Sequence, residues 1–211
     1  MIIMESMHHI NMKEIIIATN NAHKVHEYSR ILGDLGYKVL SLKDINLQVD
    51  VEENGTTFKE NAIIKAKTIS DMINKWVISD DSGLEIMALD GFPGIESARF
   101  AGHDTSYDIK NNMLLEMLKD KNDRSARYVC AIALAIPNRE SIVVEGYMEG
   151  SIAFEPKGEN GFGYDPIFMV KDKNQTAAEL SEEEKNSCSH RYYASKMIIE
   201  KIKEIESELN E

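Results

Sequence analysis

At the centre of the sequence stands Trp76-Val77-Ile78-Ser79-Asp80-Asp81-Ser82-Gly83-Leu84, an apolar run that ends in two adjacent carboxylates. Residues 76–79 predict a buried strand and residues 84–89 another, with residues 80–83 at the turn between them. An unpaired charge is costly to bury, and successive side chains of a strand face opposite ways. We therefore expect one carboxylate to face a cleft as a magnesium ligand or general base, while backbone donors hold the other. A surface turn rich in Asp and Ser is the alternative.

Strand and helix patterns alternate on both sides of this segment. Residues 13–18 and 37–42 predict strands around a helix at 22–32, and residues 127–136 and 141–147 predict a hairpin. Because strands interleave with helices, the predicted fold class is α/β with a mixed sheet. Longer helices are indicated by apolar stripes at helical spacing, namely Phe58, Ala62, Ala66, Ile69 and Ile73, then Ile109, Met113, Leu114 and Met117, then Met197, Ile198, Ile202, Ile205 and Leu209.

Two helix starts carry the sequence signature of a capping box. In this motif the side chains of the first and fourth residues satisfy each other's free backbone donors. Thr57 and Glu60 have this spacing, and so do Ser181 and Glu184.

The composition limits the partners that the chain can have. Its 211 residues fit one large domain or two closely packed lobes, with residues 1–12 as a tail. Acids outnumber bases by 36 to 24, for a net charge of −12, which repels nucleic acid and anionic membranes. Two cysteines cannot form a disulfide framework, and Cys130 in an apolar run predicts a core residue. We expect a reduced, cytoplasmic, soluble protein.

The segment Thr19-Asn20-Asn21-Ala22-His23-Lys24 lies between a predicted strand and a predicted helix. Free backbone N–H groups and the positive end of a helix dipole suit a phosphate at such a place. Thr19 adds a hydroxyl and Lys24 a point charge, although the glycines of a Walker loop are missing. The segment predicts phosphate binding, with an ordinary capped helix start as the alternative.

Glu52 and Glu53 precede the Thr57 helix, which carries Lys65. Paired carboxylates at this position complement the helix dipole, or one of them is a hard oxygen ligand for Mg²⁺. The residues alone leave both interpretations open.

The segment Gly161-Phe162-Gly163-Tyr164-Asp165-Pro166 is followed by Lys185 and then by Ser189-His190-Arg191. A Phe between two glycines lacks neighbours for core packing but is well placed to stack on a planar ring. Asp165 can accept hydrogen bonds from ring N–H groups, and Arg191 can donate to a keto oxygen. Together with the cations Lys24 and Lys65, these residues predict a nucleotide site in an otherwise acidic protein.

Eight motifs in order give the chain a specific resemblance. They include Thr19-x4-Lys24, residues 53–62, residues 80–84, Gly91-Phe92-Pro93-Gly94-Ile95-x-Ser97-Ala98-Arg99, residues 161–168, Thr176-x-Ala178-Glu179-Leu180, Glu184-Lys185 and Ser189-His190-Arg191. From residue 13 to about residue 200 the chain resembles the inosine/xanthosine triphosphate pyrophosphatases, which remove deaminated purine nucleotides.

This resemblance implies a fold, a reaction and a set of roles. The fold is an elongated mixed sheet with flanking helices and two lobes around a central cleft, here as one catalytic domain at residues 13–211. The reaction is Mg²⁺-dependent hydrolysis of ITP, dITP and XTP to the monophosphate and pyrophosphate by a homodimer. The implied substrate-binding residues are Thr19, Asn20, Asn21, Ala22, His23, Lys24, Lys65, Ser82, Phe162, Gly163, Tyr164, Asp165, Lys185, His190 and Arg191. Asp81 is the implied catalytic residue and metal ligand, with Glu53, or less readily Glu52, as the second ligand.

Three rival functions remain at this stage. They are a nucleotide-binding regulator without turnover, a related pyrophosphatase for modified pyrimidine or methylated nucleotides, and a phosphatase that releases orthophosphate. The adjacent pair Asp80-Asp81 favours an enzyme over a regulator, because a sensor needs no general base.

Overall fold

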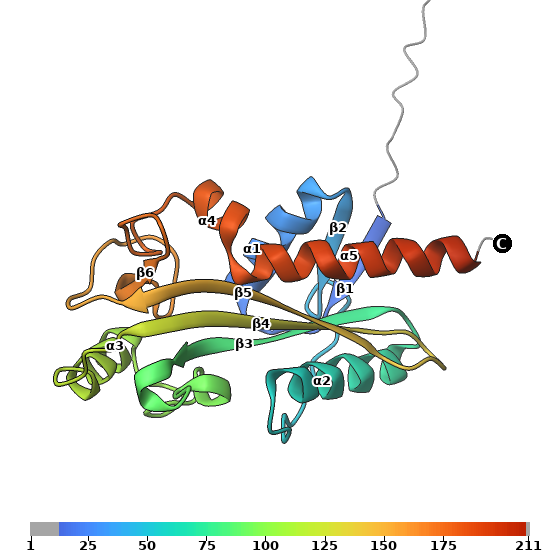
Figure 1. Cartoon of the computed structure of the whole chain (residues 1–211). Helices are drawn as coiled ribbons and strands as arrows, with labels where there is room; N and C mark the ends of the chain where they lie inside the picture. Colours follow the sequence, from blue (N-terminus) through green and yellow to red (C-terminus); the bar gives the residue numbers. More distant parts are fainter. Residues whose placement is uncertain (1–12, 210–211) are drawn as a thin grey trace, which may run out of the picture.

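A computed structural model describes residues 13–209, which form a six-stranded sheet with helices on both faces (Figure 1). The predicted tail at residues 1–12 lies outside the described residues. The strand order is β2-β1-β3-β4-β5-β6, in which β1 pairs in parallel with β2 and β3, and the remaining pairs are antiparallel. The mixed α/β sheet is therefore confirmed. The strands are β1 (Lys13–Ile17), β2 (Tyr37–Ser41), β3 (Val77–Ile86), β4 (Ser125–Ala135), β5 (Ile142–Ile152) and β6 (Phe168–Val170).

The two longest helices cover opposite faces of the sheet (Figure 1). On β4, Val129 and Ala131 pack with α2, whereas Cys130 and Ile132 pack with α5, because alternate strand residues face opposite sides. Cys130 is fully buried, as its apolar surroundings predict. The helices are α1 (Ala22–Asp34), α2 (Phe58–Ile73), α3 (Tyr107–Met117), α4 (Glu182–Cys188) and α5 (His190–Leu209), with short 3₁₀ turns η1 (Met87–Leu89), η2 (Gly94–Glu96) and η3 (Asp165–Ile167).

Two separate apolar cores lie along the elongated sheet. One includes Ile17, Tyr28 and Ile78 with the inner face of α5, and the other includes Leu84 and Ile86 with side chains of α3 and β6. Strand β3 therefore runs from one core into the other, and its polar residues 80–83 lie between them. Asp80 is nevertheless fully buried beside Tyr28 and Cys130 of the first core, so this polar stretch is tolerated in mid-strand because side chains satisfy it.

The predicted turn at residues 80–83 is wrong, because β3 continues through them from Val77 to Ile86. Gly83 is needed for close approach and not for a sharp bend. A Cβ there would lie 2.5 Å from both the Gly94 carbonyl oxygen and the Ser97 hydroxyl. The polar pattern of a turn and that of a strand with an open edge are alike in sequence.

Two further local predictions need correction. On α3 only Leu114 of the predicted apolar stripe is buried, while Ile109, Met113 and Met117 are exposed, so the helix turns that side away from the sheet. At the α2 start Thr57 accepts from the Glu60 N–H, but the Glu60 carboxylate bonds to the preceding residue, Thr56.

Most of the remaining local predictions agree with the structure, although the strand predicted at residues 84–89 ends at Ile86 and residues 87–89 form η1. The Ser181–Glu184 capping box is complete, and residues 127–136 and 141–147 lie in the β4–β5 hairpin, although β5 extends to Ile152. Along α5, Ile198, Ile202 and Ile205 are buried, whereas Leu209 is exposed. Among the described helices, none is both long and apolar enough to cross a membrane.

Candidate active site

The candidate site lies where β1 ends and leaves one edge of β3 open. Strand β1 pairs with β3 only through Ile16 and Ile17, opposite Val77 and Ile78. Beyond Ile78, side chains instead of a neighbouring strand hydrogen-bond to the backbone of β3 at this edge. The Lys65 ammonium donates to the Asp80 carbonyl at 3.0 Å, and the Ser97 hydroxyl accepts from the Leu84 N–H at 2.9 Å. An open edge between two cores gives a ligand access to both faces of the sheet.

Asp80 and Asp81 face opposite sides of the sheet, as the strand alternation predicts. Asp80 is fully buried and is held by side chains, not by the backbone donors expected from sequence. It accepts from Tyr28 at 2.6 Å and from Arg191 at 3.1 Å, and it pairs with the ammonium of Lys24. These partners hold the pKa of Asp80 well below its ordinary value despite the burial. Asp80 therefore acts as a permanent anion that orders two cavity cations.

Asp81 lies beside the cavity with an unsatisfied carboxylate oxygen. Its Oδ1 accepts from the Ser82 N–H at 3.1 Å, while its buried Oδ2 has no hydrogen-bond partner among the described residues. Burial raises the pKa of Asp81 to about 6, and the negative charge of Glu53 contributes in the same direction. A buried carboxylate in this state gains from a further cation or hydrogen-bond donor, which a ligand in the cavity can supply.

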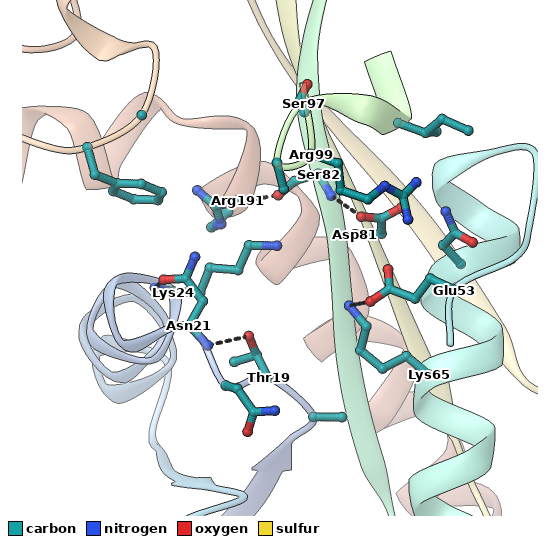
Figure 2. Close-up of a pocket in the computed structure, with 18 of the residues that line it drawn as sticks. Thr19, Asn21, Lys24, Glu53, Lys65, Asp81, Ser82, Ser97, Arg99 and Arg191 are labelled. Carbon is teal, nitrogen blue, oxygen red and sulfur yellow. Dashed lines mark hydrogen bonds and ion pairs between the residues drawn. The ribbon is translucent and has the colours of Figure 1, made fainter. Parts of the chain in front are cut away.

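Glu53, and not Glu52, is the carboxylate that meets Lys65. The Glu53 Oε1 lies 2.7 Å from the Lys65 ammonium, and Figure 2 shows both side chains next to Asp81 beside β3. Glu52 is exposed, although it also lines the cavity. Glu53 and Asp81 thus offer two hard oxygen groups to one space, which fits a divalent cation.

The segment after β1 is an Asx-capped helix start. The Asn21 Oδ1 accepts from the N–H groups of His23 and Lys24, at 3.0 and 3.3 Å. The Thr19 hydroxyl accepts from the Asn21 N–H, and the Asn20 amide donates to the Val49 carbonyl. The segment is therefore a capped helix start, which does not decide whether it binds phosphate. The cap holds the segment at the cavity rim, where Lys24 points inward (Figure 2).

The loop before η3 holds the predicted ring-stacking residue. Phe162 lines the cavity and its N–H donates to Asp165 at 2.9 Å. Asp165 is itself 2% exposed and also accepts from Lys185 at 2.7 Å and Tyr128 at 3.1 Å. Its carboxylate therefore fixes the loop from within.

Glu27, which sequence reasoning missed, connects the two buried cations of the site. Its carboxylate accepts from Lys185 and from Arg191, each at 2.9 Å, and its pKa is lowered because these charges outweigh the effect of burial. Arg191 also donates to the Ser82 hydroxyl at 2.8 Å. The neighbouring His190 is buried against Tyr128, and burial drives its pKa well below the ordinary value, so it is neutral.

These residues surround a cavity of about 610 Å³. Ala22 and His23 are the two predicted substrate-binding residues that do not line it. The structure also adds lining residues that were not among the predicted site residues. Six of them lie inside the quoted motifs, namely Asn61, Gly83, Ile95, Ser97, Ala98 and Arg99. From the predicted set the cavity is lined by Thr19, Asn20, Asn21, Lys24, Glu53, Lys65, Asp81, Ser82, Phe162, Gly163, Tyr164, Asp165, Lys185, His190 and Arg191, and the additions include Asn61, Ser97, Arg99, Tyr107 and Tyr128.

Comparison with known proteins identifies the family. The sequence model of the Ham1 family matches residues 15–201. The chain belongs to the Ham1 family. Two curated relatives, both named dITP/XTP pyrophosphatase, match this chain over nearly their whole length. The protein of Bacillus licheniformis is 54% identical over 190 residues, covering 89% of this chain and 96% of its own. The protein of Bacillus subtilis is 51% identical over 191 residues, covering 90% and 96%.

Solved Ham1 structures have the same fold. The Ham1 protein of Staphylococcus aureus has a TM-score of 0.81 at 44% identity, covering 90% of this chain and 98% of its own. The HAM1 protein of Coxiella burnetii has a TM-score of 0.82 at 41% identity, covering 92% and 100%. The elongated mixed sheet with flanking helices expected from the resemblance is therefore confirmed.

Proposed function

We propose that this chain hydrolyses dITP, ITP and XTP to the nucleoside monophosphate and pyrophosphate, removing deaminated purines from the nucleotide pool. The observation that carries the proposal is the unsatisfied Asp81 oxygen in a cavity that also holds Lys24, Lys65 and Phe162. A carboxylate, two cations and an aromatic ring are the groups that a triphosphate with a planar base requires. The names of the relatives support the same reaction.

The phosphates are assigned to the rim at residues 19–24 and to the two lysines. The helix start gives the positive end of a dipole, and Lys24 adds a charge directed into the cavity. Lys24 is paired with Asp80 and Lys65 with Glu53, so neither cation is left uncompensated in the free protein. A polyphosphate must compete for these ammonium groups, which favours a ligand of high charge over a monophosphate.

Glu53 and Asp81 would hold Mg²⁺, because both offer carboxylate oxygens to one space, and the Asp81 Oδ1, which accepts one hydrogen bond from the Ser82 N–H, has a second lone pair for the ion. When bound, the ion supplies positive charge to the phosphate oxygens during the transfer.

Asp81 is the residue that we assign to the attacking water. Its Oδ1 is held by the Ser82 N–H, which fixes the carboxylate plane, and its Oδ2 is free to accept a hydrogen bond from water. Hydrolysis between the α- and β-phosphates requires water in line with the leaving pyrophosphate. A fixed carboxylate beside the phosphate-binding cations can orient that water and accept its proton.

The base is assigned to the loop at residues 162–165 and to Arg191. Hypoxanthine and xanthine present a keto oxygen and a protonated N1, whereas adenine presents an amino group and an unprotonated N1. Arg191 uses one N–H each from Nε, Nη1 and Nη2 for Asp80, Glu27 and Ser82, which leaves two N–H groups for a keto oxygen. An unpaired buried donor costs about 1–3 kcal/mol, so adenine would be disfavoured.

Product analysis tests the reaction. The protein is incubated with Mg²⁺ and, separately, ITP, XTP, ATP and GTP. We expect monophosphate and pyrophosphate from ITP and XTP, with ATP nearly untouched. Guanine shares the keto oxygen and the protonated N1, so we expect GTP to be rejected through its 2-amino group. Orthophosphate would place the attack on the γ-phosphorus, and the absence of turnover would favour a regulator or a pyrimidine-directed enzyme.

We also propose that the enzyme is a cytoplasmic homodimer with one catalytic domain at residues 13–211, as the family resemblance implies. Light scattering on the purified chain tests the dimer, for which the expected mass is twice 23.9 kDa.

A further inference from the structure

A stacked pair of rings connects two segments that lie far apart in the sequence. His23, on the first turn of α1, and Phe162, in the loop before η3, have ring centroids 5.0 Å apart and an interplanar angle of 15°. Phe162 lines the cavity, whereas His23 is not among the described residues that do so. His23 therefore covers Phe162 from a position outside the cavity lining.

The neighbours of Phe162 in the chain do not support its ring. Gly161 and Gly163 have φ values of +73° and +71°, a region that favours glycine. A Cβ at Gly161 would lie 2.1 Å from the Asp165 Oδ2, so a larger residue there would displace the carboxylate. The loop thus requires glycines on both sides of the ring, and the ring depends on contacts from other elements for its orientation. Besides the His23 ring, these are the Lys185 ammonium and the Arg191 guanidinium, which lie over the ring at 4.9 and 5.5 Å from its centroid.

His23 is held in place independently of Phe162. Its backbone N–H donates to the Asn21 Oδ1 at 3.0 Å within the helix cap. Its side chain is exposed, so the stacked partner is the ring contact that the structure gives it. A capped helix start is a rigid platform, and a parallel ring on that platform restricts the rotation of the ring against it.

We propose that His23 is a positioning residue, which stacks on the Phe162 ring and so holds it in the orientation in which the ring meets the purine base of the substrate. This inference rests on the proposed function. It couples the two halves of the site, because the cap that shapes the phosphate-binding segment also carries the support for the base-binding ring. His23 acts through Phe162 and makes no contact with the base.

Steady-state kinetics with dITP test the inference on four proteins: wild type, His23→Ala, His23→Phe and the control His26→Ala. His26 is an exposed histidine on the same helix whose ring bonds to Glu182 at 2.8 Å, away from the cavity lining. We expect His23→Ala to raise KM about 2- to 10-fold with kcat nearly unchanged, the range for loss of one aromatic pair. His23→Phe restores KM because it keeps a planar ring, and His26→Ala matches wild type.

Inorganic tripolyphosphate, used as a competitive inhibitor, distinguishes an effect on base binding from an effect on phosphate binding, because it has no base. Its inhibition constant stays unchanged in His23→Ala if the residue acts on the base. In a Phe162→Ala background, His23→Ala has no further effect on KM, because the ring through which it acts is gone.

Three results would overturn the inference: a lower KM for His23→Ala, which would mean that the histidine blocks the ring; equal loss of tripolyphosphate inhibition; or an undiminished effect in the Phe162→Ala background. Turnover of dITP by the wild-type protein is measured first. If it is absent, the proposed function fails, whereas normal wild-type turnover with no change in His23→Ala refutes the role of His23 alone.

Discussion

Replacing Glu27 by glutamine tests how the buried charges of the site are held together. Glu27 is 7% exposed, and its two oxygens accept from Lys185 and Arg191 at 2.9 Å each. Glutamine keeps the shape but removes the negative charge, and its amide nitrogen must face one of the two cations. Breaking a buried ion pair by neutralising one partner costs about 3–5 kcal/mol.

The lower end of this range applies, because Lys185 keeps Asp165 and Arg191 keeps Asp80 as charged partners. We therefore expect a loss of about 3 kcal/mol in the free energy of unfolding at pH 7. For a chain of this size that corresponds to a fall in Tm of roughly 6–12 °C. Urea unfolding followed by circular dichroism measures the first quantity, and calorimetry measures the second.

The stability difference between the wild type and Glu27→Gln should change with pH in a defined direction. The pKa of Glu27 is lowered in the folded state from its ordinary value of 4.5, so its contribution to stability is fully present above that value. The contribution is lost as the pH falls through the lower, folded-state pKa. Glutamine does not titrate, so the stability difference between the proteins is largest near pH 7 and shrinks in acid. The control Glu182→Gln removes an exposed carboxylate and should change stability by less than about 1 kcal/mol. A Glu27→Gln effect as small as that of the control would refute the reasoning.

Three other perturbations follow from the geometry. Asp81→Asn should lower kcat for dITP about 100- to 10,000-fold without loss of folding, and near-normal turnover would remove Asp81 from its catalytic role. Gly83→Ala should lower the free energy of unfolding by about 1–3 kcal/mol, because its Cβ would lie 2.5 Å from the Gly94 carbonyl oxygen. The control Gly33→Ala has open space around its Cβ and should be neutral or stabilising. Chemical denaturation curves of both variants measure the difference. Burial raises the pKa of the Cys130 thiol, so in a Cys188→Ser background, which removes the half-buried second thiol, an aromatic disulfide reagent should modify Cys130 only after unfolding. Rapid labelling of that native variant would contradict the buried position of Cys130.

Local pattern was sufficient to predict most elements of this fold. Helix stripes and the Ser181–Glu184 cap have mechanisms that act over a few residues. The cap and most of the α2 and α5 stripes appear as expected, whereas the α3 stripe does not. The turn at residues 80–83 failed because its polarity has a tertiary cause: β1 stops at Ile17, and β3 continues beside a cavity. A single sequence does not show where a neighbouring strand ends.

The candidate site was predictable in part. Residues such as Lys24 and Asp81 were nominated by their chemistry and by motif resemblance, and the structure brings them to one cavity. Glu27 could not be found in this way, because one acidic residue on a helix is ordinarily exposed to solvent. Only the packing of α1 against α4 and α5 encloses it, next to cations more than 150 positions away. Asp165 was expected to bind a base, yet its carboxylate is already committed to the loop and to Lys185.

The open edge of β3 is also relevant to aggregation by strand pairing between copies of the chain. A strand edge with unpaired backbone groups is a template for another strand, and natural proteins protect such edges with charged side chains. Here the Lys65 ammonium donates a hydrogen bond to the Asp80 carbonyl, and the Ser97 hydroxyl accepts one from the Leu84 N–H. Lys65, which we assign to the phosphates, therefore also blocks strand pairing at this edge, together with Ser97.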